Sequence, residues 1–594
     1  MYLARHELRP LMLPRPSTFP SLETGTHFDD TKCSVQDRAE IATTALESMR
    51  KSMPLCSCYN FVDDGTGRLA NRKYPISYEP AGRPKVGPLS PPSLPTRVID
   101  LDTSDIVLGK SNVLRLRLKL SSLNDPTFAH YATLSHRWGG RIPFMTTNST
   151  FTRRVDGFWL DELPASFQDA VLVARSLGLR YLWIDSLCII QDDEADWLAQ
   201  SQQMGRIFAN ASVTIAAHSA QDSTQGFLAS FLVPDLSRTR PEDTSGSFAM
   251  PTPDSSSDAL LLQSFSRSCI SSRTWVMQEL CLSPRILHFV KNRVLWECVH
   301  TPLQIGATCP PTWAALLWQR RLSRHFGANP GEPRYDFWRE LITQYSACEM
   351  TNAGDKLVAV AGIAEQLDSF FPCSLSYNYH CGIFNPDVAR SILWYSSQAP
   401  KPLQKPQNRA PTWSWASADG RIAFAASPDG ADVTGCVVFR SVTPKGACRN
   451  TIEMASGEPS STSSTTCSLV IDGPVIGRKH AVRPREASRV ALTPQNGPQV
   501  VGIWTRAGSP TTQADYLAWE IIDSETEIDE AGKPSNIICV VTSSMSLGNR
   551  FLGAWMLLLS RDTSSPKTHK RVGLGCLLDE GIFNMARRKV LTIV

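Results

Sequence analysis

Hydrophobic and polar residues follow two different periods in the first half of the chain. In TRVIDLD (96–102) and NVLRLRLKL (112–120) they alternate with a period of two, which predicts half-buried strands. From residue 130 the pattern becomes strand, helix, strand, helix, strand. The predicted strands are 131–135, 181–190 and 212–219, with one helix starting at Pro164 and another carrying Trp197, Met204 and Phe208 on one face. This order predicts a parallel sheet with right-handed crossovers.

The remaining segments differ in composition. Residues 1–96 hold 12 of the 41 prolines, so 1–95 is predicted to be mostly irregular, with a short helix over 34–51. Residues 312–400 have a helical pattern, and the last third has about eight short β-rich runs. We therefore expect an α/β domain at 96–310, a helical extension at 311–420 and a β-rich domain at 421–594.

Composition narrows the class of protein. The 594 residues are 42% hydrophobic and 20% charged, as in folded globular proteins. The net charge is only +4, which gives no general case for nucleic acid binding. No apolar run approaches the roughly 18 residues of a membrane span, and the N-terminus lacks the pattern of a signal peptide. The 16 cysteines are scattered, so we expect a cytoplasmic protein without a disulfide scaffold or a metal site.

Four segments resemble one family. They are YATLSHRWGG (131–140), the long stretch at 163–227, RTWVMQELCLSPRILHF (273–289) and APTWSWAS (410–417). The order of these segments and their amino-acid sequences are similar to the HET, or heterokaryon incompatibility, domain of filamentous fungi. The resemblance implies a fungal protein that signals in allorecognition or programmed cell death, through unknown protein partners or self-association. Leu280 departs from the family, which usually has Arg after the Gln-Glu pair.

The HET domain is in turn remotely similar to TIR domains, and this implies a TIR-like core. Some TIR domains cleave NAD with a glutamate, and the stretch 271–280 resembles the segment that carries it. By this resemblance Glu279 is the catalytic candidate and NAD a candidate substrate rather than a cofactor. A carboxylate suits the reaction because it stabilises the oxocarbenium character of the transition state. The alternative is a glutamate on the helix surface, in an interface or a salt bridge.

Further site candidates follow two of the predicted strands. Asp185 comes after an apolar strand, and open α/β sheets bind ligands at the carboxyl ends of their parallel strands. It is either a second catalytic candidate or a cap for loop N–H groups. After the first strand come the ligand-binding candidates Ser135, His136, Arg137, Trp138 and Gly139. The alternative for this segment is a tight turn with Trp138 in the core. If Glu279 and Asp185 lie together, Arg137 or His136 is expected to compensate their charge.

Two other interpretations carry less support. Cys188, His136 and Asp185 could form a nucleophilic triad, but Cys188 lies in an apolar run where cysteines are usually buried and inert. The remaining histidines look isolated and are expected to be core or surface residues rather than metal ligands: His130, His218, His288 and His300.

Overall fold

The computed structural model describes the parts of the chain that carry its helices and strands. No helix in these parts is both long enough and apolar enough to cross a membrane. The described residues are 35–52, 62–63, 69–70, 76–78, 84–86, 91–102, 114–122, 126–140, 144–228, 231, 268–290, 293–298, 335–369, 379–384, 387–397, 409–425, 432–436, 438–445, 466–477, 481–482, 502–505, 516–522, 537–562, 565 and 567–594.

An eight-stranded mixed sheet forms the first core, in the order β12-β11-β10-β7-β9-β5-β6-β8. Its four central strands, β11, β10, β7 and β9, run parallel, and the outer strands pair antiparallel. The predicted parallel arrangement of three strands is therefore confirmed, within a sheet that is mixed as a whole. The strands are β5 Arg97–Asp100, β6 Arg115–Leu120, β7 Tyr131–Ser135, β8 Phe158–Trp159, β9 Tyr181–Trp183, β10 Val213–Ala217, β11 Arg285–Val290 and β12 Arg293–Cys298.

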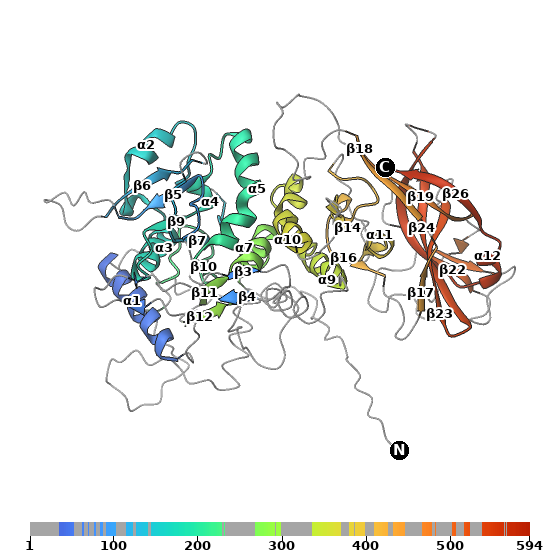
Figure 1. Cartoon of the computed structure of the whole chain (residues 1–594), viewed down its shortest axis with the longest axis horizontal. Coiled ribbons are helices and arrows are strands. Elements are labelled where there is room, and N and C mark those ends of the chain that lie inside the picture. The colour runs from blue at the N-terminus through green and yellow to red at the C-terminus, as the bar shows by residue number, and fades with distance from the viewer. Residues whose placement is uncertain are drawn as a thin grey trace, which may run out of the picture.

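Helices cover both faces of this sheet (Figure 1). From β7 the chain moves outward through α3 (Ala165–Ser176) to β9, then returns through α5 (Glu194–Asn210) past β7 to β10. Because right-handed crossovers in opposite directions lie on opposite faces, α3 and α5 are on different sides. On the α3 side lies α1 (Val35–Ser52), the helix predicted over 34–51. On the α5 side lie α7 (Thr274–Leu282) and α10 (Val358–Ser369).

Two strand predictions need correction. β9 ends at Trp183 instead of continuing to 190, because α4 (Asp185–Cys188) begins there. The Asp185 carboxylate accepts the Ser186 N–H at 2.7 Å, a local hydrogen bond that competes with strand pairing. β5 was expected to be half-buried but is buried at every residue, since it lies between β6 and β9.

The segment expected to be helical contains helices and short strands together. The helices are α9 (Asp336–Tyr345), α10 and α11 (Val388–Ser391), with a 3₁₀ turn at Ala353–Lys356. Between them lie two antiparallel pairs, which the helical prediction missed: β13 Tyr379–His380 with β14 Ile383–Phe384, and β15 Trp394–Ser396 with β16 Ile422–Phe424. Residues 312–334 lie outside the described residues. Trp338, Trp394 and Trp415 are buried here and belong to the same hydrophobic cluster as the residues of the first sheet, so this segment extends that core rather than forming a loose helical surface.

The last third is β-rich, as predicted, and forms a ten-stranded sheet. It contacts the preceding segment through Arg571, a fully buried residue whose guanidinium donates to the Trp394 carbonyl and lies 3.8 Å from the centre of the Trp394 ring. The strands are β17 Asp432–Gly435, β18 Val438–Lys445, β19 Thr466–Gly477, β20 Ala481–Val482, β21 Gly502–Thr505, β22 Tyr516–Ile522, β23 Ile538–Leu547, β24 Arg550–Arg561, β25 Thr568–Leu577 and β26 Arg587–Ile593, with α12 at Glu580–Asn584.

The small elements that remain are α2 (Phe151–Asp156), a 3₁₀ turn at Leu160–Glu162 and another at Trp415–Ser417. Two short hairpins, β1 Val62–Asp63 with β2 Leu69–Ala70 and β3 Ile76–Tyr78 with β4 Pro84–Val86, interrupt the segment expected to be irregular. The α/β class and the β-rich third are thus observed. The expected domain boundaries at 95, 310 and 420 stay predictions.

Candidate functional site

The candidate residues meet at the carboxyl ends of the parallel strands. β7 ends in Ser135 and is followed by His136, and Asp185 follows β9. The chain leaves β7 toward β9 on one side and reaches β10 on the other, so the strand order reverses beside β7. Such a reversal is where open α/β sheets form their ligand-binding crevice. α7 lies against this edge of the sheet and carries Glu279.

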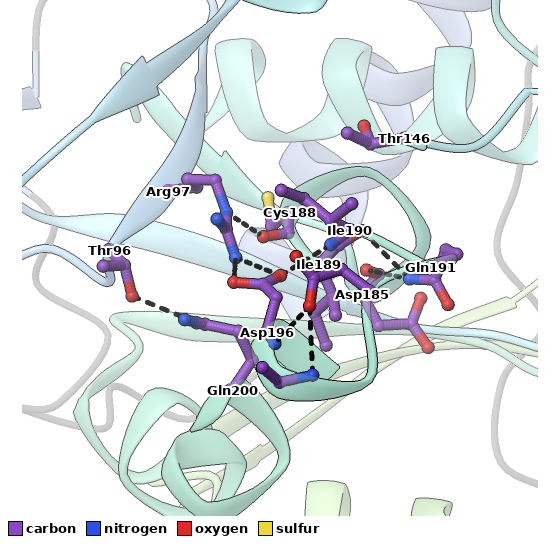
Figure 2. Close-up of polar contacts among 12 residues, drawn as sticks. Thr96, Arg97, Thr146, Asp185, Cys188, Ile189, Ile190, Gln191, Asp196 and Gln200 are labelled. Atoms are coloured by element: carbon purple, nitrogen blue, oxygen red, sulfur yellow. Dashed lines mark hydrogen bonds and ion pairs between the residues drawn. The ribbon is translucent and has the colours of Figure 1, made fainter. Parts of the chain in front are cut away.

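A network of polar contacts holds the segment after β9 (Figure 2). Arg97 Nε donates to the Cys188 carbonyl at 2.6 Å, and the Arg97 guanidinium pairs with Asp196 at 2.5 Å. The Asp196 carboxylate also accepts the Ile190 N–H at 2.8 Å. On the other side, Thr146 hydrogen-bonds to backbone groups of Ser186, Leu187 and Gln191. The backbone that carries Asp185 is therefore fixed, while its carboxylate lies apart from the Arg97–Asp196 pair.

Asp185 has partners for its carboxylate. One oxygen accepts the Trp138 indole N–H at 2.6 Å, and the other accepts the Ser186 N–H at 2.7 Å. His136 Nδ1 lies 4.0 Å from the carboxylate. These contacts join the end of β9 to the loop after β7. They support the expected capping role, and they show Trp138 as a partly buried hydrogen-bond donor rather than a core residue.

The conformation of the loop after β7 is fixed by its backbone geometry and by its contacts. Gly139 has φ +81°, and a Cβ there would lie 2.5 Å from Asp222 Cβ, so both backbone and space require glycine. Ser223 donates to the Trp138 carbonyl at 3.1 Å and secures the same loop. Gly139 thus serves the turn, one of the two roles expected for it. Arg137 is partly buried and makes no ion pair within the described part of the chain.

Glu279 is buried, which excludes the expected alternative of a surface glutamate. Only 3% of its surface is exposed. Burial raises the pKa of Glu279 to about 7; Arg273 opposes this shift, and the nearby Asp185 charge adds to it. The Ser135 hydroxyl lies near enough to lower this pKa slightly, although Ser135 Oγ makes no hydrogen bond of good geometry. The structure therefore brings Glu279, Asp185 and Ser135 into one cluster.

Arg273 is the cation of this cluster, a role that sequence reasoning assigned to Arg137 or His136. Arg273 stands just before α7 and donates to the His136 carbonyl, so it joins the loop after β7 to the helix that carries Glu279. His136 cannot supply the charge, because its burial lowers its pKa to about 4 and keeps the ring neutral near pH 7. The sequence feature that could have indicated this cation was the arginine of the RTW motif at 273–275.

Three buried polar atoms in this region lack a hydrogen-bond partner among the described residues: Ser135 Oγ, His136 Nε2 and Ser186 Oγ. The His136 ring packs edge-on against Phe167, with their centres 5.0 Å apart. Strand alternation places Ser135 on the same face of β7 as Thr133, whose hydroxyl meets Thr214 at 2.7 Å beneath α7. Unpaired buried donors and acceptors are costly, and a ligand with hydroxyl or amide groups would satisfy them.

The rival nucleophile is excluded by its surroundings. Cys188 is fully buried, and burial raises the pKa of its thiol to about 12, so almost no thiolate forms near pH 7. Leu280, which stands where the family usually has arginine, lies in an apolar cluster with residues of β10, β11, α7 and the turn before α7: Ala216, Ile270, Val276, Ile286 and Val290. It contributes to packing and leaves the positive charge to Arg273.

The histidines are less isolated than expected. His130 contacts Ser212 at 3.0 Å, whereas His218 and His288 hydrogen-bond to each other at 3.0 Å. His300 lies outside the described residues. Across the part of the chain that the structure describes, no three His, Cys, Asp or Glu side chains are grouped to hold a metal ion.

Comparison with known proteins identifies the region around this site. The family model described as heterokaryon incompatibility protein (HET) matches residues 131–279, from the start of β7 to Glu279. No curated protein and no solved structure matches the chain. The likeness to TIR domains has no support in these comparisons and stays a prediction. The matched residues span the parallel strands β7, β9 and β10 and the whole candidate cluster, and this region of the chain is therefore a HET domain, the domain associated with heterokaryon incompatibility.

Proposed function

We propose that this chain is a signalling protein of fungal allorecognition or programmed cell death, acting through protein partners or self-association. The observation that carries the proposal is the HET match over residues 131–279, on an α/β core that includes the clustered side chains. The proposed place of action is the cytoplasm. Eight cysteines of the described residues are free, as is usual in a reducing compartment: Cys188, Cys269, Cys281, Cys348, Cys381, Cys436, Cys539 and Cys576.

Induced expression in a filamentous fungus tests this role. The full chain is expressed from an inducible promoter, and dead hyphal compartments are counted with a vital dye. Expression of wild type should cause compartment death, and a fluorescent fusion should lie in the cytoplasm. Trp183→Ala is the matched loss-of-fold control, because it empties a fully buried position in β9. Undamaged hyphae at wild-type protein levels would contradict a direct role in cell death.

A second candidate function is NAD cleavage at the nicotinamide bond, with Glu279 and Asp185 in the site. The specific observation in its favour is a buried glutamate with a pKa of about 7, clustered with Asp185 and Ser135 where parallel strands end. Water would attack the ribose carbon as the bond to nicotinamide breaks, giving ADP-ribose, nicotinamide and one proton. In this proposal the ionised Glu279 stabilises the positive charge that develops on the ribose.

The unpaired polar atoms suit this substrate class. Ser135 Oγ and His136 Nε2 are buried and free to bond with ribose hydroxyls, and Arg137 on the adjacent loop is placed to meet a phosphate. Trp138 and Gly139 would shape the loop rather than contact the reacting atoms, since their contacts go to Asp185 and Asp222. Nicotinamide release should rise as pH increases through about 7, because the reaction needs the ionised carboxylate.

Purified full-length protein incubated with NAD gives a direct test, with nicotinamide measured by chromatography. Glu279→Gln should abolish release, whereas the control Glu349→Gln should retain it. Glu349 is exposed, and only its backbone contacts the start of α7. No release by folded wild type, tested as monomer and as any assembled form, would rule out the enzymatic candidate and leave the signalling proposal standing.

A further inference from the structure

A line of four hydrogen-bonded polar side chains connects β10, β11, β12 and the segment before α7. Ser268 Oγ lies 2.9 Å from His218 Nδ1, His218 Nε2 lies 3.0 Å from His288 Nδ1, and His288 Nε2 lies 3.1 Å from Glu297 Oε2. All four residues are buried, with Ser268 the most accessible at 6%. His218 directly follows β10, His288 lies within β11, Glu297 lies within β12, and Ser268 precedes α7. The topology therefore brings β11, β12, the end of β10 and the segment before α7 together, and one residue from each lies in a single line.

The chemistry of these groups fixes the direction of the hydrogen bonds. An ionised Glu297 can only accept, so His288 Nε2 carries the hydrogen and His288 Nδ1 is an acceptor. His218 Nε2 must then donate to His288, which leaves the lone pair on His218 Nδ1 facing Ser268. The Ser268 hydroxyl donates to that lone pair. Each hydrogen bond in the line thus has one donor and one acceptor. The line ends at the Ser268 hydroxyl, which lies against the unprotonated Nδ1 of His218.

The surroundings keep this imidazole neutral. Burial and the neighbouring His288 lower the pKa of His218 well below its usual value. On β11 the alternating residues Ile286, His288 and Val290 share one face, and Ile286 and Val290 belong to an apolar cluster with Ile270. Ile270 is two residues after Ser268, so the serine lies close in sequence to a residue of this packed apolar cluster.

We propose that Ser268 is a nucleophile for acyl transfer from small esters with apolar acyl groups. His218 acts as its general base, while His288 and Glu297 are positioning residues that fix the tautomer of His218. This site uses no residue of the Glu279 cluster, so it stands or falls independently of the functions proposed above.

The reaction balances without any additional reagent except water. Ser268 Oγ bonds to the ester carbonyl carbon, and its proton passes to His218 Nδ1. The tetrahedral intermediate expels the alcohol, which takes the proton back from His218. Water then attacks the acyl-serine by the same route, releasing the carboxylic acid and restoring the serine. Both halves need only one proton to move between the oxygen atoms and His218 Nδ1.

A fluorophosphonate probe tests the nucleophile on the full chain. The probe should label folded wild type, with Ser268 Oγ bonded to phosphorus and fluoride released, and peptide mapping should place the label on Ser268. Ser268→Ala should lose the label, and Ser272→Ala, which removes a nearby hydroxyl outside the line, should keep it. Absence of labelling of wild type, or a label mapped to another serine, would overturn the proposal.

The positioning residues need a test that a purely structural role would not pass. Glu297→Gln should slow labelling at least about tenfold, because an amide can donate to His288 and reverse the tautomers. Glu297→Asp should recover part of the rate, since a carboxylate again accepts from His288. Thermal melting is measured on each variant, and hydrolysis of p-nitrophenyl acetate should follow the same ranking. Equal labelling rates in Glu297→Gln and wild type, at equal melting temperature, would overturn the role of the line.

Discussion

Asp169 and Glu279 are buried carboxyl groups on helices that cover opposite faces of the same sheet. Asp169, on α3, is fully buried and accepts hydrogen bonds from Arg38 Nε at 2.8 Å and from the Leu228 N–H at 2.9 Å. Glu279, on α7, has Arg273 and Ser135 nearby, but burial outweighs both and raises its pKa to about 7. Burial raises the pKa of both carboxyl groups, but Asp169 has an ion pair with Arg38 and backbone hydrogen bonds that oppose the shift, whereas fewer groups oppose it at Glu279.

The difference separates a structural role from a candidate functional one. A buried charge with a full set of partners can be maintained by the fold alone. A buried carboxyl beside unpaired atoms such as Ser135 Oγ and His136 Nε2 costs stability, and natural proteins concentrate such costs at functional sites. The α3 side therefore anchors α1, whereas the α7 side is where a ligand should bind.

The largest expected effect comes from breaking the satisfied pair. Arg38→Ala removes the cation from Asp169 and leaves that carboxylate buried and uncompensated. Because such half-broken pairs are strongly destabilising, the free energy of unfolding should fall by about 3–5 kcal/mol in a urea titration. Glu40→Ala, an exposed change on the same helix, is the matched control and should alter it little. Equal stability of the two variants would mean that α1 does not depend on Asp169.

Glu279→Gln should act with the opposite sign. The pKa of Glu279 is about 7 in the folded state against 4.5 in the reference state. A raised carboxyl pKa favours the fold below about pH 4.5, and this contribution is lost as pH rises through about 7. Glutamine does not titrate, so the variant should exceed wild type by about 3 kcal/mol near pH 8.

Near pH 4.5 the same two proteins should be almost equally stable, which makes the low-pH titration the internal control. Urea titrations at several pH values measure the difference directly. A variant less stable than wild type at pH 8 would show that the Glu279 carboxylate is satisfied, and the contrast with Asp169 would fail.

The sequence allowed much of this contrast to be anticipated, but not its compensating groups. Hydrophobic period predicted the parallel strands, and the ends of those strands indicated Asp185 and Ser135. The sequence did not predict Arg273 as the cation of the cluster, because its partner is the backbone carbonyl of His136, 137 residues away. No rule based on residue spacing indicates such a contact. The strand at 181–190 was predicted too long because a run of apolar residues looks the same in a strand as in the buried helix α4 that replaces its end.

The pairing of His218 with His288 was not predicted from the sequence, for a related reason. It depends on the parallel register that sets Ala216 opposite His288. The register between strands that are distant in sequence cannot be predicted from the sequence of either strand alone. The β-rich third shows the same limit, since its strands were largely predicted but not their order.

An intermediate effect is expected at Asp185, the one carboxylate of the cluster with good partners. Trp138→Phe keeps the ring but removes the indole N–H that donates to Asp185 at 2.6 Å. Hydrogen bonds to charged groups contribute about 1.5–3 kcal/mol, so thermal or urea unfolding should show a loss of that size. A loss below about 0.5 kcal/mol would place Asp185 with Glu279, among the weakly satisfied groups.

The smallest effect compares two buried serines on the two sides of the sheet. Ser166, on α3, donates to the Ser223 carbonyl at 2.8 Å, whereas Ser135 Oγ, at the end of β7, has no partner within the described part of the chain. Ser166→Ala should cost about 1 kcal/mol, the usual net value of a hydrogen bond. Ser135→Ala removes a hydroxyl that was desolvated without compensation, so the free energy of unfolding should stay equal or rise slightly. Parallel urea titrations of both variants give the comparison. Equal losses would mean that Ser135 is bonded in the native protein, and the α7 side of the sheet would then have one fewer open position for a ligand.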